Sequence, residues 1–458
     1  MAEPWEVSLP CPRCVVLERR SAELEARIRE LERSLLEAVR ASKRQAAPFS
    51  RNQPKKNPKK PGRPDGHEAA LRPLPAAPQI TETIDGPLEH CPGCGGPVDD
   101  VQTHQQVVAD LPKIEPVTRQ YVTHSGYCPR CARRVRSRHP EQSSEATGSA
   151  GNQIGPTALA LAADLKHRLG LSYRKVVELF DCHFGLRLCA ATLARAGQRL
   201  ARFAAGTYQA LIHVVQASSV VYADETGWRV SARSAWLWVF TNRFVTVYVI
   251  RAERSSAVIR DMLGDFFTGV LSSDCCASYD PIEADKQKCL GHILKDLSAI
   301  GAIKSRTTGR FSRDASGVLQ DAMDLKRRRA ALSDHGYASA RGRIETRMDR
   351  LLDRSYRDPD NRRLANRMIK HRPHLFTFLY QKGVEPTNNA AERAIRPAVI
   401  SRKLSAGNRS PTGANIHGIL ASLAQTARQN GRDFVAAAKT ILCKRDPRYI
   451  EPLIPALA

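Results

Sequence analysis

The sequence predicts a multidomain protein of the α+β class, in which largely helical segments precede and follow a mixed β-sheet. Its 458 residues correspond to about three domains of ordinary size. Runs of β-branched and aromatic residues are concentrated between residues 220 and 274, whereas helical periodicity dominates on either side. Cysteine pairs with Cys-x-x-Cys spacing precede the region of strands, which predicts small metal-binding segments as well.

The composition indicates the charge of the partner and excludes some classes of protein. Lysine and arginine number 71 against 46 aspartates and glutamates, so the formal net charge is +25, which predicts an anionic partner. With 42% hydrophobic residues the chain can bury a large core, which excludes wholesale disorder. No stretch approaches the roughly 18 consecutive apolar residues of a membrane span, and the start lacks the pattern of a signal peptide. We therefore expect a cytoplasmic protein without a membrane partner, whose reduced cysteines are available as metal ligands.

Residues 1–45 predict a short coiled coil. Apolar residues recur at heptad spacing, at Leu17, Leu24, Ile28, Leu31 and Leu35. Glutamates and arginines between them form a solvated face of mixed sign, which could pair across a partner helix. A lone amphipathic helix packed on its own chain is the alternative, so the pattern leaves dimerisation as a hypothesis.

Residues 46–75 predict a basic linker, because they are rich in Pro, Lys, Arg, Gly and Asn and lack helical or strand periodicity. Its Lys59, Lys60 and Arg63 are candidates for contact with DNA phosphates. The piece Pro61-Gly-Arg-Pro64 is similar to an AT-hook, in which an extended arginine lies in a narrow minor groove. Of the two readings, we expect nonspecific phosphate contact before groove recognition.

Residues 76–140 predict a zinc ribbon whose ligands are two Cys-x-x-Cys knuckles, Cys91 with Cys94 and Cys128 with Cys131. Four thiolates at tetrahedral angles make a closed structural zinc site. Two alternating segments between the knuckles, residues 106–111 and 119–124, fit the strands of a ribbon. One of three nearby histidines could replace a cysteine ligand, and a further cysteine pair has no evident second half: His90, His104 and His124, and Cys11 with Cys14.

Residues 150–215 predict a helical region. Two helices around Gly185, with several arginines nearby, would suit a helix-turn-helix that binds DNA. A plain helical hairpin with solvated arginines is the alternative.

Residues 216–430 carry the strands. Their order is a strand at 220–224, a hairpin at 235–250, a helix at 255–263 and a further strand at 269–274. The first and the last of these strands end in Asp224 and Asp274. This order is that of a ribonuclease-H-like domain, in which these two strands lie side by side and their terminal carboxylates converge.

The convergence of acids predicts a cation site. Carboxylates that share a buried site repel each other, whereas divalent cations keep them ionised. Oxygen ligands favour Mg²⁺ or Mn²⁺. Glu392 supplies a third carboxylate in the first turns of a helix for which Thr387 or Asn388 is the N-cap. For each acid taken singly, a solvated loop carboxylate is the alternative.

Three blocks of the sequence are similar to the signature blocks of the insertion sequence 66 family of bacterial DDE transposases. They are Tyr222-Ala-Asp-Glu-Thr-Gly-Trp228, Leu271-Ser-Ser-Asp274 and Asn388-Asn-Ala-Ala-Glu-Arg-Ala-Ile-Arg-Pro397. The basic linker, the zinc ribbon and residues 171–175 and 410–418 also resemble family segments in the same order, so the resemblance covers nearly the whole chain. Cys275-Cys276 and Lys295, which follows Cys289 and His292, depart from the family pattern but leave the acids in place.

The resemblance implies an enzyme that cleaves and joins DNA strands. Asp224, Asp274 and Glu392 would be its catalytic triad and would hold two Mg²⁺ or Mn²⁺ ions. Water would then attack in line, and the freed 3′-OH at the element's end would attack target DNA. The implied partners are double-stranded DNA of the element's terminal repeats and of the target, at least one second protomer, and accessory proteins of the same element, all at the nucleoid.

Residues 296–385 predict a helical insertion that could hold DNA, and residues 431–458 a C-terminal helical tail. Arg393 and Arg396 are candidates for phosphate contact, with ordinary helix charges as the alternative. Glu225 should face away from Asp224, because neighbouring strand residues point to opposite faces. Cys289 and His292 could indicate a second metal, but we expect a packed cysteine and a hydrogen-bonding histidine.

Two other function classes compete with a transposase. One is a zinc-ribbon DNA-binding regulator with a catalytically inactive core, and intact acids at all three positions argue against it. The other is a ribonuclease-H-like nuclease that cuts without joining. The ribbon, the basic linker and the insertion argue against that class.

Overall fold

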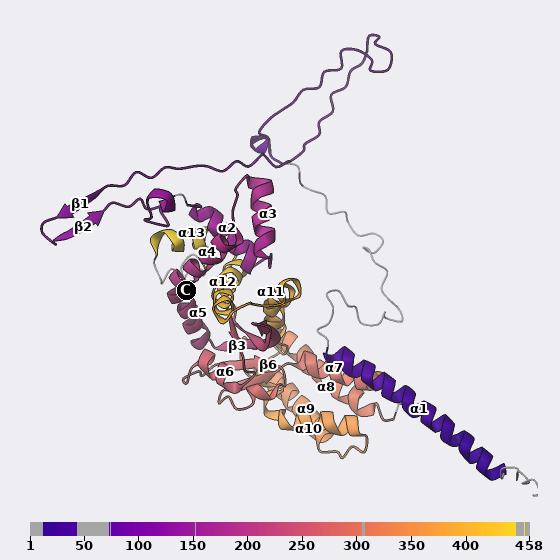
Figure 1. The fold of residues 1–458 in the computed structure, drawn as a ribbon. Coiled ribbons are helices and arrows are strands. Elements are labelled where there is room, and N and C mark those ends of the chain that lie inside the picture. The colour runs from indigo at the N-terminus through magenta and orange to yellow at the C-terminus, as the bar shows by residue number, and fades with distance from the viewer. Residues whose placement is uncertain are drawn as a thin grey trace, which may run out of the picture. The chain divides into compact units, whose positions relative to one another are not determined.

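The computed structural model describes residues 12–43, 73, 75–151, 153–304, 307–445 and 453. The chain divides into two compact units, Met1–Pro112 and Lys113–Ala458. The architecture is mixed α/β, with a mixed five-stranded sheet and many helices in the second unit (Figure 1). Within the described ranges, no helix combines the length and the apolar character that crossing a bilayer requires.

The first unit contains α1 (Pro12–Lys43), drawn in indigo in Figure 1, and a 3-10 turn, η1 (Ala77–Gln79). The helix expected here is confirmed. After Pro12 at the first position it contains neither glycine nor proline, so nothing in the sequence interrupts it. Apart from residues 73 and 75, the basic linker that follows lies outside the described residues, and so do Lys59, Lys60, Arg63 and Cys11.

The second unit begins with a short hairpin of β1 (Ser125–Cys128) and β2 (Arg133–Arg136), paired antiparallel. The segments 106–111 and 119–124 were expected as strands, and this expectation is wrong, since neither contains a strand. Pro112 and Pro116 lie between them and cannot donate to a ladder, which explains why alternation alone did not produce pairing. The hairpin forms instead around the second cysteine pair.

Four helices follow: α2 (Pro156–His167), α3 (Tyr173–Phe184), α4 (Ala190–Phe203) and α5 (Ala205–Gln216). Gly185 ends α3 with a φ of 61°, a left-handed conformation that glycine adopts without strain. The last described helix, α13 (Phe434–Lys444), packs against α2 and α4, so the C-terminal segment returns to this layer.

The sheet has the strand order β5-β4-β3-β6-β7. Its strands are β3 (Val220–Val230), β4 (Arg233–Thr241), β5 (Thr246–Arg251), β6 (Val270–Ser273) and β7 (Asp285–Lys288). The first three pair antiparallel, whereas β6 lies parallel to β3 and β7 lies parallel to β6. β3 and β6, which are the first and fourth strands of this sheet in sequence order, are therefore neighbours, as expected.

Strand β3 is longer than expected. It does not end at Asp224 but continues to Val230, where Ser231 and Ala232 turn the chain into β4 with φ values of 51° and 63°. The reason is its neighbour, because β4 pairs with β3 along the whole stretch from Tyr222 to Val230. Asp224 thus lies within a strand, two residues beyond Tyr222, which is the last residue of β3 that pairs with β6.

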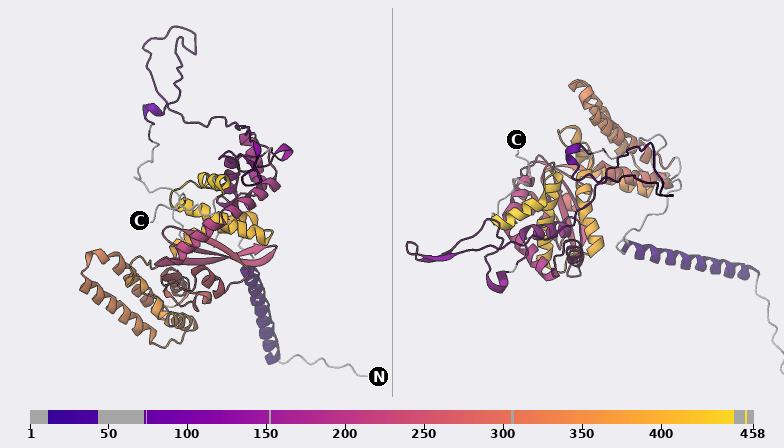
Figure 2. Two further views of the ribbon diagram at one scale, coloured as in Figure 1. Left: turned by 90° about the vertical axis from the view of Figure 1, so that its left-hand side faces the viewer. Right: turned by 90° about the horizontal axis from the view of Figure 1, so that it is seen from above.

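Helices cover both faces of the sheet (Figure 2). Alternate residues of β3 belong to different cores: Val221 and Ala223 pack with helices α2–α5, α12 (Pro411–Gln429) and α13. Val220 and Tyr222 pack on the opposite face with α7 (Leu290–Ile303) and the helices that follow it up to α11 (Asn389–Ser405). The helix α6 (Ser256–Leu263) connects β5 to β6, where a helix was expected.

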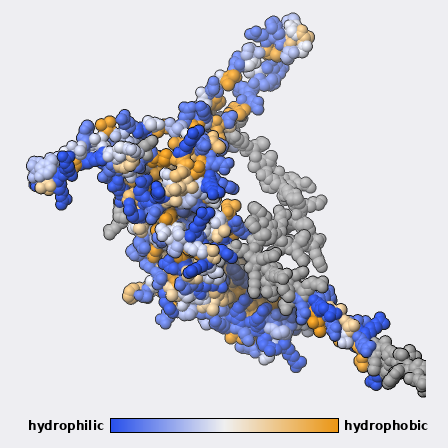
Figure 3. Space-filling model, viewed as in Figure 1, coloured by the Kyte–Doolittle hydropathy of each residue, from blue (hydrophilic) through white to orange (hydrophobic). Residues whose placement is uncertain are grey.

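The expected helical insertion is present between β7 and α11. It consists of α8 (Arg310–Arg327), α9 (Asp334–Leu352) and α10 (Pro359–Lys370), with α7 leading into it. Figure 2 shows these helices, in orange, extending from the sheet. The surface over α9 and α10 is largely hydrophilic in the view of Figure 3.

Candidate active site

Asp224 lies within β3 and Asp274 directly follows β6, at the same level of these two neighbouring parallel strands. The pairing of β3 with β6 matches Tyr222 with Ser272, and each aspartate comes two residues later. Burial is the largest cause that raises the pKa of Asp224, to about 7, and the charges of Glu225 and Asp274 raise it further. The pair is therefore a half-buried concentration of negative charge, which a cation would relieve.

The loop after β6 holds Asp274 in place. The backbone N–H of Cys276 donates to Asp274 Oδ1 over 2.9 Å, and Lys288 Nζ donates to the Asp274 carbonyl oxygen over 3.0 Å. Lys288 is fully buried and also lies 3.6 Å from Asp280. Cys275-Cys276, which depart from the family pattern, thus leave this acid oriented by backbone contacts that do not depend on their side chains.

Glu225 points to the other face of β3, as the strand alternation predicts. It accepts hydrogen bonds from the Tyr279 hydroxyl and from Arg254, and Tyr279 belongs to the core of Val221 and Ala223. From that side its carboxylate still comes near the acids: ligand atoms of Glu225, Asp274 and Cys276 lie within 4.8 Å of one another. The sequence analysis did not predict that the Glu225 carboxylate lies near Asp274, although the position of Glu225 next to Asp224 in the sequence could have indicated it.

Arg254 is a second residue near the acids that was not predicted from the sequence. Its guanidinium pairs with Glu225 at 2.5 Å and lies over the Trp236 ring, 4.6 Å from the centroid. No local pattern marks this arginine, since it lies in the loop before α6 and reaches Glu225 only through the fold. It supplies a fixed positive charge at the edge of the acidic cluster.

Glu392 lies in the first turn of α11, and Asn388 is the N-cap residue of that helix. The Asn388 side chain caps nothing within the helix but donates to the carbonyl oxygen of Ala223 over 2.7 Å. The Asn388 backbone N–H donates to Cys289 Sγ over 3.1 Å. Asn388 thereby ties the start of the Glu392 helix to the residue that precedes Asp224.

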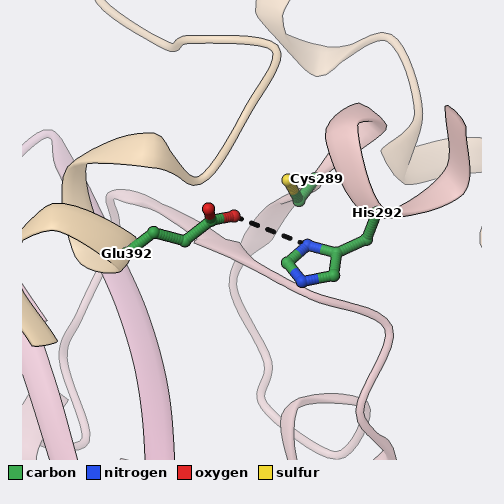
Figure 4. A group of neighbouring side chains, drawn as sticks. All are labelled: Cys289, His292 and Glu392. Carbon is green, nitrogen blue, oxygen red and sulfur yellow. Dashed lines mark ion pairs between the residues drawn. The ribbon is translucent and has the colours of Figure 1, made fainter. Parts of the chain in front are cut away.

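Glu392 is close to His292 and Cys289 (Figure 4). Glu392 Oε1 lies 3.7 Å from His292 Nδ1, and one ligand atom from each of these three residues lies within 4.8 Å of the others. The hydrogen bond with Cys289 is the largest cause that raises the pKa of His292, to about 9, and the charges of Glu392 and Asp274 add to it. The histidine thus places a positive charge among the three acids.

The three predicted acids come from adjacent elements but do not form one compact group. Asp274 groups with Glu225 and Cys276, and Glu392 groups with Cys289 and His292. Among the described residues, no group of ligand atoms within 4.8 Å of one another unites Asp224, Asp274 and Glu392. The residue types of both groups can hold a divalent cation. The first offers two carboxylates and a thiol, and the second a thiol, an imidazole and a carboxylate.

A groove of about 1280 Å³ is lined by residues of β3 and of the start of α11, although Asp224, Asp274 and Glu392 themselves do not line it. Arg393, which follows Glu392, lines it together with Arg243 and Arg428, and all three arginines are exposed. Tyr222 also lines the groove and shares a face of β3 with Asp224. Arg396 is exposed on the same helix as Arg393. The groove therefore presents positive charge on the two elements, β3 and α11, that carry Asp224 and Glu392.

The four predicted zinc ligands form two turns in different units. In the first, Gly95 N–H donates to the Cys91 carbonyl oxygen over 2.8 Å, and backbone hydrogen bonds from Gly93 and Cys94 lower the pKa of Cys91. In the second, a backbone hydrogen bond from Cys131 is the largest cause that lowers the pKa of Cys128. Each turn by itself favours the thiolate, which is the form that binds zinc.

The chain matches one family of known proteins. Residues 151–416 match the model of the family described as "Transposase IS66 family", which is more than half of the chain. The matched region runs from just before α2 into α12 and contains Asp224, Asp274 and Glu392. Curated proteins give no match.

Proposed function

The chain belongs to the IS66 family of transposases, and we propose that it cleaves and joins DNA through a catalytic triad of Asp224, Asp274 and Glu392. The observation that carries the proposal is the parallel pairing of β3 with β6, which sets the two aspartates side by side. Asn388 supports it by tying the Glu392 helix to Ala223. The strand order β5-β4-β3-β6-β7 agrees with the arrangement expected of a ribonuclease-H-like core.

The three carboxylates fit the Mg²⁺ or Mn²⁺ that the family implies. All three supply oxygen ligands, and the raised pKa of Asp224 is that of a buried carboxylate without sufficient countercharge. Bound divalent ions would supply an activated water and stabilise the departing 3′ oxygen. Asp224 and Asp274 would hold an ion from the sheet, and Glu392 would close the site from α11.

The arginine-lined groove is our candidate for the path of a DNA strand. Arg393, Arg243 and Arg428 would contact phosphates, and Tyr222 would lie against the strand next to Asp224. Arg396, and in the linker Lys59, Lys60 and Arg63, would add nonspecific phosphate contacts. The two cysteine knuckles would close one structural zinc site, with Cys91, Cys94, Cys128 and Cys131 as ligands.

The test is strand cleavage and joining on labelled DNA that carries the element's own ends, with Mg²⁺ or Mn²⁺ and with EDTA. We expect metal-dependent joined product from the wild type and a loss of about 100-fold or more in Asp224→Asn, since a ligand to the ion is weakened. Asp261→Asn is the matched control, because Asp261 is exposed on α6 and belongs to neither group of metal-ligating side chains among the described residues.

Each other outcome points to a different function. Cleavage without joining would identify a nuclease. Binding to the ends with neither reaction, and with equal behaviour of wild type and Asp224→Asn, would identify a DNA-binding regulator. A full loss in Asp261→Asn would show that the assay reports folding rather than the triad.

A further inference from the structure

Three residues of different donor type meet at the starts of two helices. Cys289 is the N-cap residue of α7, His292 follows it in the first turn, and Glu392 lies in the first turn of α11. One donor atom of each, a sulfur, a nitrogen and an oxygen, lies within 4.8 Å of the other two (Figure 4). From the sequence, Cys289 and His292 were expected only to pack and to form a hydrogen bond, and Glu392 is the third donor that the fold adds.

The spacing of these donors is close to that around a tetrahedral zinc ion. Zinc lies about 2.3 Å from a thiolate sulfur and about 2.0–2.1 Å from a nitrogen or oxygen ligand, so two of its ligands are about 3.3–3.6 Å apart. Glu392 Oε1 and His292 Nδ1 are 3.7 Å apart. Their separation is therefore within about 0.4 Å of the value that zinc requires.

Backbone hydrogen bonds fix the two helix starts against each other. The N–H of Leu290 donates to the carbonyl oxygen of Pro386 over 2.9 Å, and the N–H of Asn388 donates to Cys289 Sγ over 3.1 Å. A hydrogen bond from an N–H to sulfur favours the thiolate, which is the form that binds zinc. The fold therefore holds the donors together before any ion binds.

The donor types select zinc over magnesium. Mg²⁺ takes oxygen ligands, whereas thiolate and imidazole are ligands of zinc and of related transition metals. Cys289 is fully buried, but the side chains of His292 and Glu392 are 46% and 44% exposed. An ion can therefore reach the site from this open side and keep water as its fourth ligand, as zinc does in sites with three protein ligands.

We propose that Cys289, His292 and Glu392 bind a zinc ion, at a site separate from that of the two cysteine knuckles. Three protein ligands and an open side make this site weaker than one of four thiolates. The ion must also displace a proton from His292, which lowers the affinity further. The site therefore fills with added zinc and is empty after purification, whereas the knuckles keep their ion.

This zinc site competes with the proposed catalytic site for Glu392. The competition rests on the proposed function, in which Glu392 closes the Mg²⁺ or Mn²⁺ site from α11. A ligand shared with Cys289 and His292 stays in the group that it forms in the structure, which does not include Asp274. Zinc should therefore inhibit strand transfer even when Mg²⁺ is in excess.

The first measurement titrates the full-length chain, purified with zinc on its knuckles, with Co²⁺, a coloured ion that binds in zinc sites. We expect about one equivalent of Co²⁺ to produce a thiolate-to-cobalt charge-transfer band, and Zn²⁺ to remove the band by displacing the probe. Cys289→Ser should abolish the band, because no sulfur ligand remains. His292→Asn, at an exposed position that does not threaten folding, should weaken Co²⁺ binding about tenfold or more.

Two control variants separate this site from other cysteines. Cys443→Ser replaces another buried cysteine, on α13, and should keep the band. Cys276→Ser removes the thiol of the group that contains Glu225 and Asp274, and it should keep the band as well. Loss of the band in Cys276→Ser would place the ion in that group and overturn the proposal.

The second measurement is strand transfer in excess Mg²⁺ with zinc at about ten times its dissociation constant. The rate of the wild type should fall about tenfold, because about nine in ten chains carry zinc. The rate of His292→Asn, relative to the same variant without zinc, should change much less.

The outcomes distinguish the zinc site from the proposed chemistry. A wild type without the cobalt band, or a band of equal strength in Cys289→Ser and His292→Asn, would overturn the site. The expected band together with joining that zinc does not inhibit would overturn the competition for Glu392. A wild type that shows the band but joins no DNA under any condition would contradict the proposed function alone, because the band does not depend on activity.

Discussion

Nδ1 of His292 lies 3.7 Å from the Glu392 carboxylate, and the positive charge of this histidine also lowers the pKa of Asp224. A single imidazolium at the start of α7 is thus coupled to acids on α11 and at β3. Its charge has the sign of a bound cation, although its value is smaller than that of a divalent ion. The histidine and a metal ion therefore act on the same carboxylates.

Replacing His292 should tighten metal binding. In His292→Asn the acids lose a neighbouring positive charge, so their attraction for a divalent cation increases. We expect the dissociation constant for Mn²⁺, measured by titration calorimetry on the full chain, to fall several-fold. His335→Asn, at an exposed position on α9, is the control and should leave the constant unchanged. A weaker constant in His292→Asn would show instead that the histidine supports the ion directly.

Arg393 should contribute to DNA affinity without selecting sequence. Arg393→Ala removes one phosphate contact from the groove, so affinity should fall about three- to tenfold on every sequence. The slope of log affinity against log salt should decrease by about one charge. Arg347→Ala is the control, because Arg347 is already paired with Asp321 at 2.7 Å. Equal effects of the two substitutions would argue that net charge, not the groove, determines binding.

The cysteine knuckles should hold one zinc ion per chain. Cys128→Ser removes a proposed ligand, so the zinc content of the purified protein, measured by mass spectrometry of the metal, should fall from about one equivalent towards zero. Cys182→Ser, at an exposed cysteine on α3, should retain the full equivalent. Zinc that remains bound in Cys128→Ser would place the ion at other ligands.

The sequence predicted those elements whose pattern is local. The apolar runs that became β4, β5 and β6, the helix α6 and the start of the Glu392 helix all carry their own periodicity or capping residues. Strand β7 was missed because its sequence, Asp285-Lys-Gln-Lys288, is polar and is buried only through the fold, where Gln287 bonds to Leu375 and Phe378. The contact of Arg254 with Glu225 could not be predicted for a similar reason, because the two residues are 29 positions apart in the sequence and meet only in the fold.

The buried pair of His167 and His417 should make stability depend on pH. Their Nδ1 atoms lie 3.2 Å apart, so one ring donates to the other, and the Nε2 atoms of both have no hydrogen-bond partner in the described part of the chain. Burial lowers the pKa of His417 to about 4 and is the largest cause that holds the pKa of His167 well below its usual value. Both histidines are therefore neutral in the folded protein at pH values where the unfolded chain is protonated.

The sign follows from proton linkage. Below pH 6.5 the unfolded state binds more protons than the folded state, so stability falls as the pH falls towards 4. Between pH 7.5 and 5.5 each histidine should cost about 1.4 kcal/mol of unfolding free energy. In urea denaturation the wild type should thus lose about 1.4 kcal/mol more than His417→Gln over this interval. The exposed control His335→Gln should lose as much as the wild type, whereas equal losses in His417→Gln and the wild type would exclude the buried pair as the source.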